Sequence, residues 1–318
     1  MRRADVAMYR AKTKGKGGFE VFEPSMQEVA ARRLEVSTDL ERALDRGELV
    51  VMYQPFVDMT DSNPIGVEAL VRWNHPRWGR VHPGDFIGVA EECGLITALG
   101  LKVLEEACTQ QQAWLAEFGN EGPFSLSVNV STRQLRDHRF VSDVWSVLSR
   151  TGLDPARLIL EITESFTLDN PENAGSRLRE LKQLGVRISI DDFGTGYSSL
   201  AMLQELPIDI LKIDKAFVDH VADDPRRAAF ARAIVRLGRT LGLELVAEGV
   251  ETGAQRERLL SLGCHMAQGF FFAPALTADE VGHMLRRARM LRQTAGDRSV
   301  AAAEREAELL TLGQSLAM

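Results

Sequence analysis

The sequence predicts an α/β fold, a (β/α)8 TIM-like barrel whose first strand runs antiparallel to the rest. Eight short apolar runs rich in β-branched residues alternate with segments of helical period over roughly 230 residues, which is typical of a closed barrel rather than an open sheet. The first two runs are joined only by residues 57–64. That connection is too short for a crossover helix, so these two strands are expected to be antiparallel neighbours.

The expected strands follow one another along most of the chain. They cover residues 49–56, 65–73, 124–131, 158–163, 186–192, 208–214, 243–250 and 265–272. Segments of helical period lie between most of them, such as 86–118 and 226–242. Several helices are expected to stop at a glycine, as in KQLG (182–185), RTLG (239–242) and LSLG (260–263), because glycine is favoured just past a helix end.

The sequence divides into a barrel and three appendages. Residues 1–23 are expected to form a short helix and a strand that are too small to fold alone, and residues 24–48 a linking helix. Residues 49–285 make the barrel. Residues 286–318 are rich in Ala, Glu and Arg with little apolar periodicity, which indicates a helical or disordered tail, or alternatively an oligomerising helix.

Composition excludes several classes of protein. The formal net charge is −7 and the pI is about 5.5, so the chain has no general nucleic-acid footprint. The three cysteines form no CxxC pair, which argues for a reducing compartment and against structural zinc. No apolar run reaches the length of a signal peptide core or of a membrane span. The sequence therefore predicts a soluble, cytoplasmic protein.

Polar residues close the apolar runs, at the strand ends where barrel enzymes place their active sites. They are Gln54, Glu68, Asn129, Glu161, Asp191 with Asp192, Lys212 with Asp214, Glu248 and Gln268. A polar residue at one strand end is ordinary, because loops are solvated. The whole series indicates a site, since Glu161, Lys212 and Glu248 each lie within otherwise apolar segments.

This set of side chains predicts a metal site. Hard oxygen donors without His or Cys are the ligands of Mg²⁺ or Mn²⁺ rather than of zinc. The adjacent Asp191 and Asp192 could let one carboxylate bridge two ions, and two such ions stabilise the attacking and leaving oxygens of a phosphodiester displacement. The GTGYSS segment that follows, residues 194–199, is either a backbone turn close to phosphate or an ordinary tight turn.

Several spaced motifs resemble those of the EAL domain family, whose members are phosphodiesterases specific for cyclic di-GMP. The motifs are GVEALVRW (66–73), HPGDFIGVAEECGLI (82–96), SVNVS (127–131), LEITES (160–165), DDFGTGYSSL (191–200), LKIDK (211–215), AEGVE (247–251) and QGF (268–270). They occur in the family's order over roughly residues 35–285. Residues 4–22 are similar to the last helix and strand of a GGDEF diguanylate cyclase domain, whose signature is absent.

The resemblance implies hydrolysis of cyclic di-GMP to linear pGpG by a water that two metal ions activate. It implies metal ligation by Glu68, Asn129, Glu161, Asp191, Asp192 and Glu248. Lys212 would orient the attacking water, and Glu248 is the candidate general base. Substrate contacts are expected from Gln54, Arg72, Asp214 and Gln268, and Glu164 is expected to support the 191–200 loop. The resemblance also implies a homodimer and upstream GGDEF or sensory domains in a longer parent protein.

Two other functions compete with this one. Some members of the family lack turnover and act as cyclic di-GMP receptors or docking modules; the complete ligand set here favours the enzyme. The acidic side chains alone are also compatible with another Mg²⁺-dependent barrel enzyme that acts on a phosphate ester. One departure bears on the substrate: FFAPAL (271–276) stands where the family usually has an Arg-Pro pair, so a substrate-contacting arginine is absent.

Overall fold

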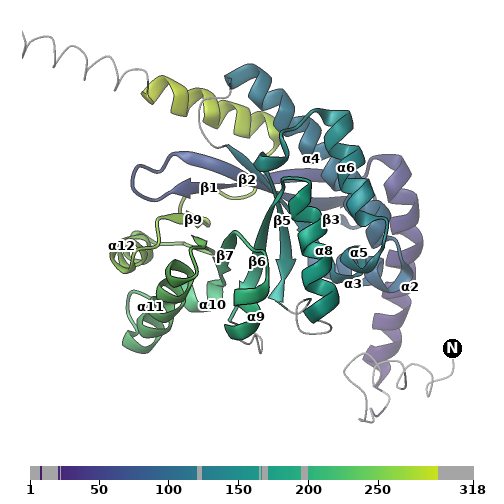
Figure 1. The fold of residues 1–318 in the computed structure, drawn as a ribbon. Coiled ribbons are helices and arrows are strands. Elements are labelled where there is room, and N and C mark those ends of the chain that lie inside the picture. Colours follow the sequence, from purple (N-terminus) through teal and green to yellow (C-terminus); the bar gives the residue numbers. More distant parts are fainter. Residues whose placement is uncertain are drawn as a thin grey trace, which may run out of the picture.

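Eight strands close into a barrel in the computed structural model, which describes residues 8, 21, 23–119, 124–164, 166, 171–194 and 200–292. The strands are β1 (Leu49–Asp58), β2 (Pro64–His75), β3 (Gly79–Val81), β4 (Ser125–Val130), β5 (Leu158–Thr163), β6 (Arg187–Phe193), β7 (Ile210–Ile213), β8 (Glu244–Ala247) and β9 (Met266–Gln268). All but β3 belong to the closed barrel (Figure 1).

Helices surround this barrel. They are α2 (Pro24–Arg46), α3 (Pro83–Cys93), α4 (Ile96–Phe118), α5 (Thr132–Arg136), α6 (Phe140–Thr151), α8 (Pro171–Gln183), α9 (Leu200–Glu205), α10 (Lys215–Val218), α11 (Pro225–Thr240) and α12 (Gly253–Leu262). A 3₁₀ turn covers Pro155–Arg157, and a final helix covers residues 278–292. No helix within these described ranges is long and apolar enough to cross a membrane.

The strand directions confirm the predicted topology. β1 is antiparallel to β2 and also to β9, and every other neighbouring pair within the barrel is parallel. Pairing of β1 with both β2 and β9 closes the sheet on itself. The short β3 was not predicted. It pairs antiparallel with the end of β2, and three residues are too few to show a period of two.

Two predicted elements differ in detail from those observed. The helical segment 86–118 is two helices, because Gly94 takes a left-handed φ of 83° and ends α3, a conformation that glycine adopts without strain. The runs expected at 243–250 and 265–272 pair as strands only over Glu244–Ala247 and Met266–Gln268. Gly249 and Gly269 follow those strands with positive φ, which turns the chain out of the sheet.

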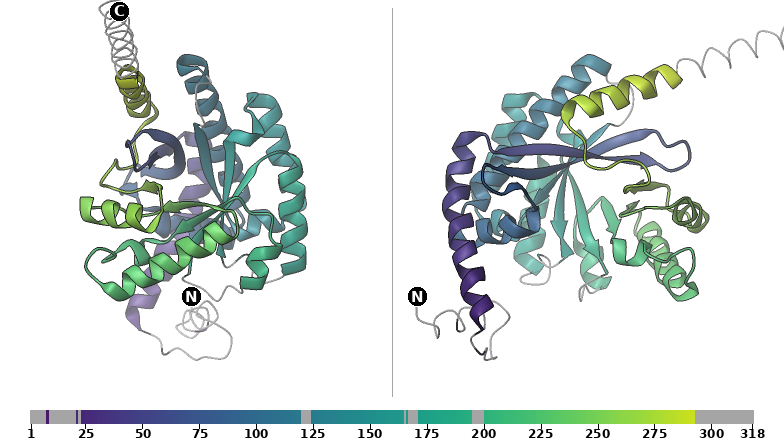
Figure 2. Two further views of the ribbon diagram at one scale, coloured as in Figure 1. Left: turned by 60° about the vertical axis from the view of Figure 1, so that its left-hand side comes forward. Right: turned by 180° about the vertical axis from the view of Figure 1, so that it is seen from behind.

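The helix that was predicted to link the N-terminal segment to the barrel packs against the barrel itself. Val36, Leu40 and Ala43 of α2 are buried, and Asp39 accepts from the ring of His75 at 3.2 Å and from Arg77 at 2.6 Å. Figure 2 shows α2 along one side of the barrel and the final helix next to β1 and β2. Residues 1–7, 9–20, 22 and 293–318, which include most of the two terminal appendages, lie outside the described residues.

The apolar core has two parts. The larger part lies between the strands and the helices. The smaller part lies inside the barrel, where Phe56, Ile159, Ile210 and Val246 pack together. Gly66 makes room for the Phe56 ring, since a Cβ at this glycine would stand 2.1 Å from Phe56 Cζ. Ile159 and Ile210 come two residues before Glu161 and Lys212 on the same strands, so this apolar layer lies directly beneath those two polar side chains.

Candidate active site

The strands of the barrel bring most of the predicted polar residues to one end. β2 carries Glu68, β4 Asn129, β5 Glu161, β6 Asp191, β7 Lys212 and β9 Gln268, and Glu248 follows β8 directly. Asn129 is the register partner of Glu161 on the neighbouring parallel strand. Parallel strands put their carboxyl ends at the same edge of a barrel, so residues far apart in sequence meet there.

Lys212 lies at the centre of this group. Its Nζ is 2.5 Å from Glu248 Oε1, 2.8 Å from Glu161 Oε2, and 3.4 Å from both Glu68 Oε2 and Asp191 Oδ1. The side chain of Lys212 is only 3% exposed, so its ammonium group is separated from bulk water. Burial alone would lower the pKa of Lys212, but the four carboxylates raise it well above its ordinary value, and the lysine stays charged.

Two amides hold Glu68 in place. Asn129 Nδ2 donates to Glu68 Oε1 at 2.6 Å, and Gln268 Nε2 donates to Glu68 Oε2 at 2.6 Å. Burial pushes the pKa of Glu68 up, but the Lys212 charge and these two hydrogen bonds hold it below its ordinary value. Glu68 is therefore a buried carboxylate that remains ionised.

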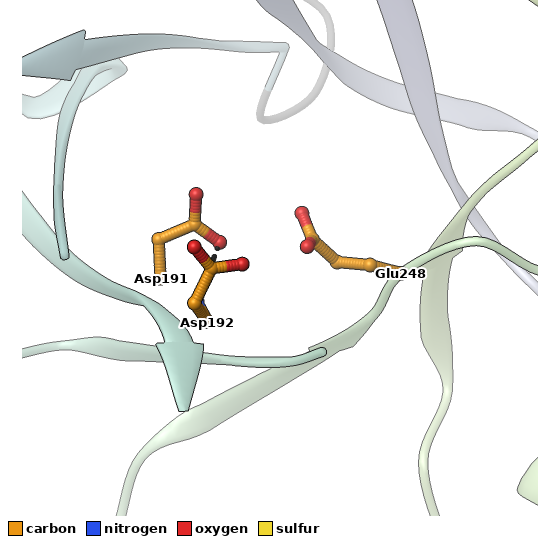
Figure 3. A group of neighbouring side chains, drawn as sticks. All are labelled: Asp191, Asp192 and Glu248. Atoms are coloured by element: carbon orange, nitrogen blue, oxygen red, sulfur yellow. Dashed lines mark hydrogen bonds between the residues drawn. The ribbon is translucent and has the colours of Figure 1, made fainter. Parts of the chain in front are cut away.

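Asp191, Asp192 and Glu248 form an acidic cluster whose carboxylate oxygens lie within 4.8 Å of one another. Figure 3 shows Glu248 facing the two aspartates across the site. Asp192 has a φ of 55°, a left-handed conformation that a non-glycine residue rarely adopts. Its backbone N–H donates to Asp191 Oδ1 at 2.9 Å. This turn is what lets two consecutive residues present their carboxyl groups to the same space.

The crowding of carboxylates raises several pKa values. Burial, with the negative charges of Asp191 and Glu68, raises the pKa of Glu248 to about 8 although Lys212 opposes it. Burial and the neighbouring Asp191 and Asp214 raise the pKa of Asp192 to about 6. The pKa of Glu161 is raised well above its ordinary value by burial and by Glu68. Without a further cation, the site takes up protons near neutral pH.

The acidic cluster has the composition of a site for a divalent cation. It offers only carboxylate oxygens, which hard cations prefer, and no imidazole or thiolate. Burial and repulsion from neighbouring carboxylates raise the pKa values of Asp192 and Glu248 despite the positive charge of Lys212, and a divalent cation would offset that repulsion. The residues present thus fit a metal ion bound by oxygen ligands.

The other predicted residues lie around this centre. Gln54 is the register partner of Glu68 on the antiparallel β1, and its Nε2 donates to the Ala273 carbonyl at 3.2 Å. Gln54 does not close its strand as predicted, because β1 continues to Asp58. Its pairing with Glu68 of β2 nevertheless places Gln54 at the same height in the barrel as the site.

Arg72, Asp214 and Glu164 each have a local partner. Arg72 Nη1 donates to the Val71 carbonyl at 2.9 Å. Asp214 caps α10 by accepting from the Ala216 N–H at 2.9 Å, and its carboxyl group also hydrogen-bonds Asp192. Glu164 Oε2 accepts from the Gly194 N–H at 2.9 Å. Residues 195–199 of the predicted DDFGTGYSSL loop lie outside the described residues.

Sequence reasoning missed two serines beneath the site. Ser127 Oγ donates to Glu161 Oε1, and Ser189 is fully buried. Each stands two residues before a predicted site residue, Asn129 and Asp191 respectively. The strand period of two places both serines on the inner face of the barrel, which is the signal that could have identified them.

Comparison with known proteins identifies relatives of this site and fold. The model of the EAL domain family matches residues 37–275. The bifunctional diguanylate cyclase/cyclic di-GMP phosphodiesterase MucR of Pseudomonas aeruginosa is 46% identical over 278 residues, which are 87% of this chain and 40% of that protein. An uncharacterised signalling protein of Caulobacter vibrioides is 46% identical over 85% of this chain and 33% of its own length.

A solved structure extends the similarity to three dimensions. The structure described as PaMucR phosphodiesterase in complex with c-di-GMP superimposes with a TM-score of 0.74 at 46% identity, covering 78% of this chain and 99% of that one. The chain therefore spans only 40% and 33% of the length of these two curated relatives, but 99% of the chain in the solved structure.

Proposed function

The chain belongs to the EAL domain family, and from that membership we propose that it hydrolyses one phosphodiester bond of cyclic di-GMP to give linear pGpG. The observation that carries the proposal is the group of acidic side chains that the strand ends gather around Lys212, together with the neighbouring carboxylates of Asp191, Asp192 and Glu248. The similarity to a phosphodiesterase whose structure is described as a c-di-GMP complex supports the choice of substrate.

The proposed cofactor is a pair of Mg²⁺ or Mn²⁺ ions. Glu68, Asn129, Glu161 and Asp191 would hold the first ion, and Asp191 with Asp192 the second, beside Glu248. When bound, such ions neutralise charge on the phosphate and make water a stronger nucleophile. The donor set supports this assignment, because four carboxylates surround a single ammonium group and a fifth, Asp192, lies beside Asp191 and Glu248.

Lys212 and Glu248 have the catalytic roles in this proposal. The Lys212 ammonium is held rigidly by its four carboxylate neighbours, so it can orient the attacking water and offset negative charge that develops on the phosphate oxygens. Glu248 is the general base that accepts a proton from that water. Burial and the neighbouring carboxylates raise its pKa to about 8 when no cation is bound, and a bound divalent cation would lower that pKa towards neutral pH, where a general base works efficiently.

The remaining proposed contacts are to the substrate and the loop. Gln54, Arg72, Asp214 and Gln268 would contact the nucleotide, with Arg72 placed to donate charge-assisted hydrogen bonds to phosphate. Glu164 would anchor the 191–200 loop through Gly194. We further propose a cytoplasmic homodimer, and upstream GGDEF or sensory domains in the parent protein, supported by the similarity of residues 4–22 to the end of a GGDEF domain.

The test is conversion of cyclic di-GMP to pGpG, followed by chromatography with Mg²⁺, with Mn²⁺ and with a chelator. The parent chain is compared with Asp191→Asn and Asp192→Asn, and with Asp223→Asn as a control on an exposed aspartate. We expect metal-dependent product that both site variants lose and the control keeps. Binding of the nucleotide without product would make the chain a receptor, and neither binding nor product would refute the substrate.

A further inference from the structure

A cavity of about 280 Å³ lies inside the barrel beneath the acidic site. Its roof includes Glu161 and Lys212, and its lower lining includes the first residues of several parallel strands, among them Ser125, Arg187 and Glu244. It therefore begins at the end of the barrel opposite to the proposed substrate. Arg187 and Glu244 form an ion pair of 2.7 Å beside it.

The two sides of this cavity differ in chemistry. Phe56, Ile210 and Val246 supply an apolar side. On β4 and β6 the inward positions are instead occupied by Ser125, Ser127 and Ser189, because the strand period of two brings small hydroxyl side chains to the interior. Empty cavities in proteins are lined by apolar groups throughout, and this one is not.

Ser189 supplies the observation that points to an occupant. Its side chain is fully buried, and its Oγ has no hydrogen-bond partner in the described part of the chain. A buried hydroxyl without a partner costs free energy that native proteins rarely leave uncompensated. The one other such side-chain atom among the described residues is Oε1 of Gln111, which does not line this cavity.

We propose that the cavity holds a chain of internal water molecules anchored at Ser189 Oγ. Its volume has room for several waters, and its hydroxyl, carboxylate, ammonium and guanidinium groups supply the two to four polar partners that each buried water needs. A water that reaches Ser189 Oγ would complete the hydrogen bonding of this hydroxyl. The inference rests on the barrel interior and holds whether or not the proposed substrate is correct.

The water chain leads to the centre of the site. Ser127 lines the cavity and donates to Glu161, and Glu161 accepts from Lys212 at 2.8 Å. Hydrogen bonds thus run from Ser127 through Glu161 to the Lys212 ammonium. Water in the cavity continues this series of hydrogen bonds towards the Arg187–Glu244 ion pair. Lys212 is then connected by hydrogen bonds to water at the end of the barrel opposite to the proposed substrate.

The first test counts long-lived internal waters by ¹⁷O magnetic relaxation dispersion, with a high-resolution crystal structure beside it. The parent is compared with Ser189→Ala, with Ser189→Val, which replaces the hydroxyl by methyl groups, and with Ser261→Ala, an exposed serine whose hydroxyl donates to the Arg258 carbonyl. We expect ordered water within hydrogen-bond distance of Ser189 Oγ, fewer internal waters in both Ser189 variants and an unchanged count in the control.

A dry cavity in the parent, or density there for a larger molecule, would overturn the proposal. The melting temperature, Tm, gives a second and independent test of bound water. If water bonds to Ser189, Ser189→Ala removes a partner from that water and lowers Tm; if the hydroxyl has no partner, the same variant removes a buried unsatisfied group and raises Tm. A higher Tm for Ser189→Ala would therefore also count against bound water. None of these measurements requires turnover.

Discussion

Lys212 shows how single residues determine the chemistry of this site. A buried lysine normally loses its proton, yet here four carboxylates within 3.4 Å keep it charged. Burial and the repulsion between those carboxylates raise the pKa values of Glu161 and Glu248, although the ammonium group opposes the rise. The lysine and the carboxylates act as one unit, and a change at any member alters the others.

Replacement of Lys212 tests its proposed catalytic role. We expect Lys212→Met to lower kcat for cyclic di-GMP hydrolysis about 10²–10³-fold, because it removes an oriented charge from the reacting phosphate. Lys215→Met is the matched control, since Lys215 is exposed and pairs with Asp219 and Glu251 instead. Thermal unfolding with Mg²⁺ present checks that both variants fold. A folded Lys212→Met protein with parental kcat would remove Lys212 from the mechanism.

At the scale of elements, the close contact of β2 with its neighbours depends on Gly66. A Cβ there would meet Phe56 Cζ at 2.1 Å and the Ser125 carbonyl at 2.5 Å. We expect Gly66→Ala to lower the free energy of unfolding by about 1–3 kcal/mol, because the ring and the backbone must both move. Urea unfolding followed by circular dichroism measures it.

Gly88→Ala is the control for that substitution. Gly88 lies in α3 with no atom within 4 Å of an added Cβ and no positive φ. Alanine in a helix interior is favoured over glycine, so this variant is expected to gain about 0.5–1 kcal/mol. Equal effects of the two substitutions would show that the contact around Phe56 is looser than the structure indicates.

The packing of α2 against the barrel is also carried by a few polar contacts. Asp39 of α2 accepts from His75 and Arg77, and two residues past the helix end Glu48 accepts from the Trp73 indole N–H at 3.1 Å. His75 and Trp73 are buried. These contacts attach the helix to the end of β2, the strand that also carries Glu68 and so reaches the active site.

We expect Asp39→Ala to destabilise the protein by about 1–2 kcal/mol, because the buried His75 loses its acceptor. Asp45→Ala, on the same helix at an exposed position, should change stability by less than about 0.5 kcal/mol. Denaturant unfolding of both variants gives the comparison. Indistinguishable midpoints would mean that α2 is held by its apolar face alone.

At the scale of the whole molecule, the site opposes folding when its carboxylates are ionised and no further cation is bound. The folded pKa of Glu248 is about 8 and that of Asp192 about 6, both above their ordinary values. Between the ordinary and the raised values, the folded state binds more protons than the unfolded state. The free energy of unfolding therefore falls as pH rises through that window.

This gives a prediction for the intact chain. In chelator, Tm should decline as pH rises from about 5.5 to about 8.5, and added Mg²⁺ should raise Tm more at the upper end, because metal binding then displaces fewer protons. Differential scanning fluorimetry measures both series. Glu248→Gln should flatten the decline. A metal-free Tm that rises with pH over this range would contradict the pKa assignment.

The sequence alone predicted much of the fold, and it pointed to polar residues at strand ends, most of which the barrel brings together. The alternation of eight apolar runs with helical segments predicted the barrel, and the short 57–64 connection predicted the antiparallel β1; the structure confirms both. Both features are local patterns along the chain, so they can be recognised from the sequence alone. Short elements such as β3 were missed because three residues carry no periodicity, and the expected 86–118 helix divides at Gly94.

Contacts between distant side chains were decided only by the tertiary structure. Gln268 and Glu68 are separated by 200 residues and Lys212 and Glu68 by 144, yet each pair is within hydrogen-bond distance. Such contacts depend on strand register and barrel closure, which a pattern along one chain does not specify. For the same reason the sequence named the residues of the site, whereas only the fold shows Lys212 among four carboxylates, Gln54 level with Glu68, and Ser189 facing the cavity beneath them.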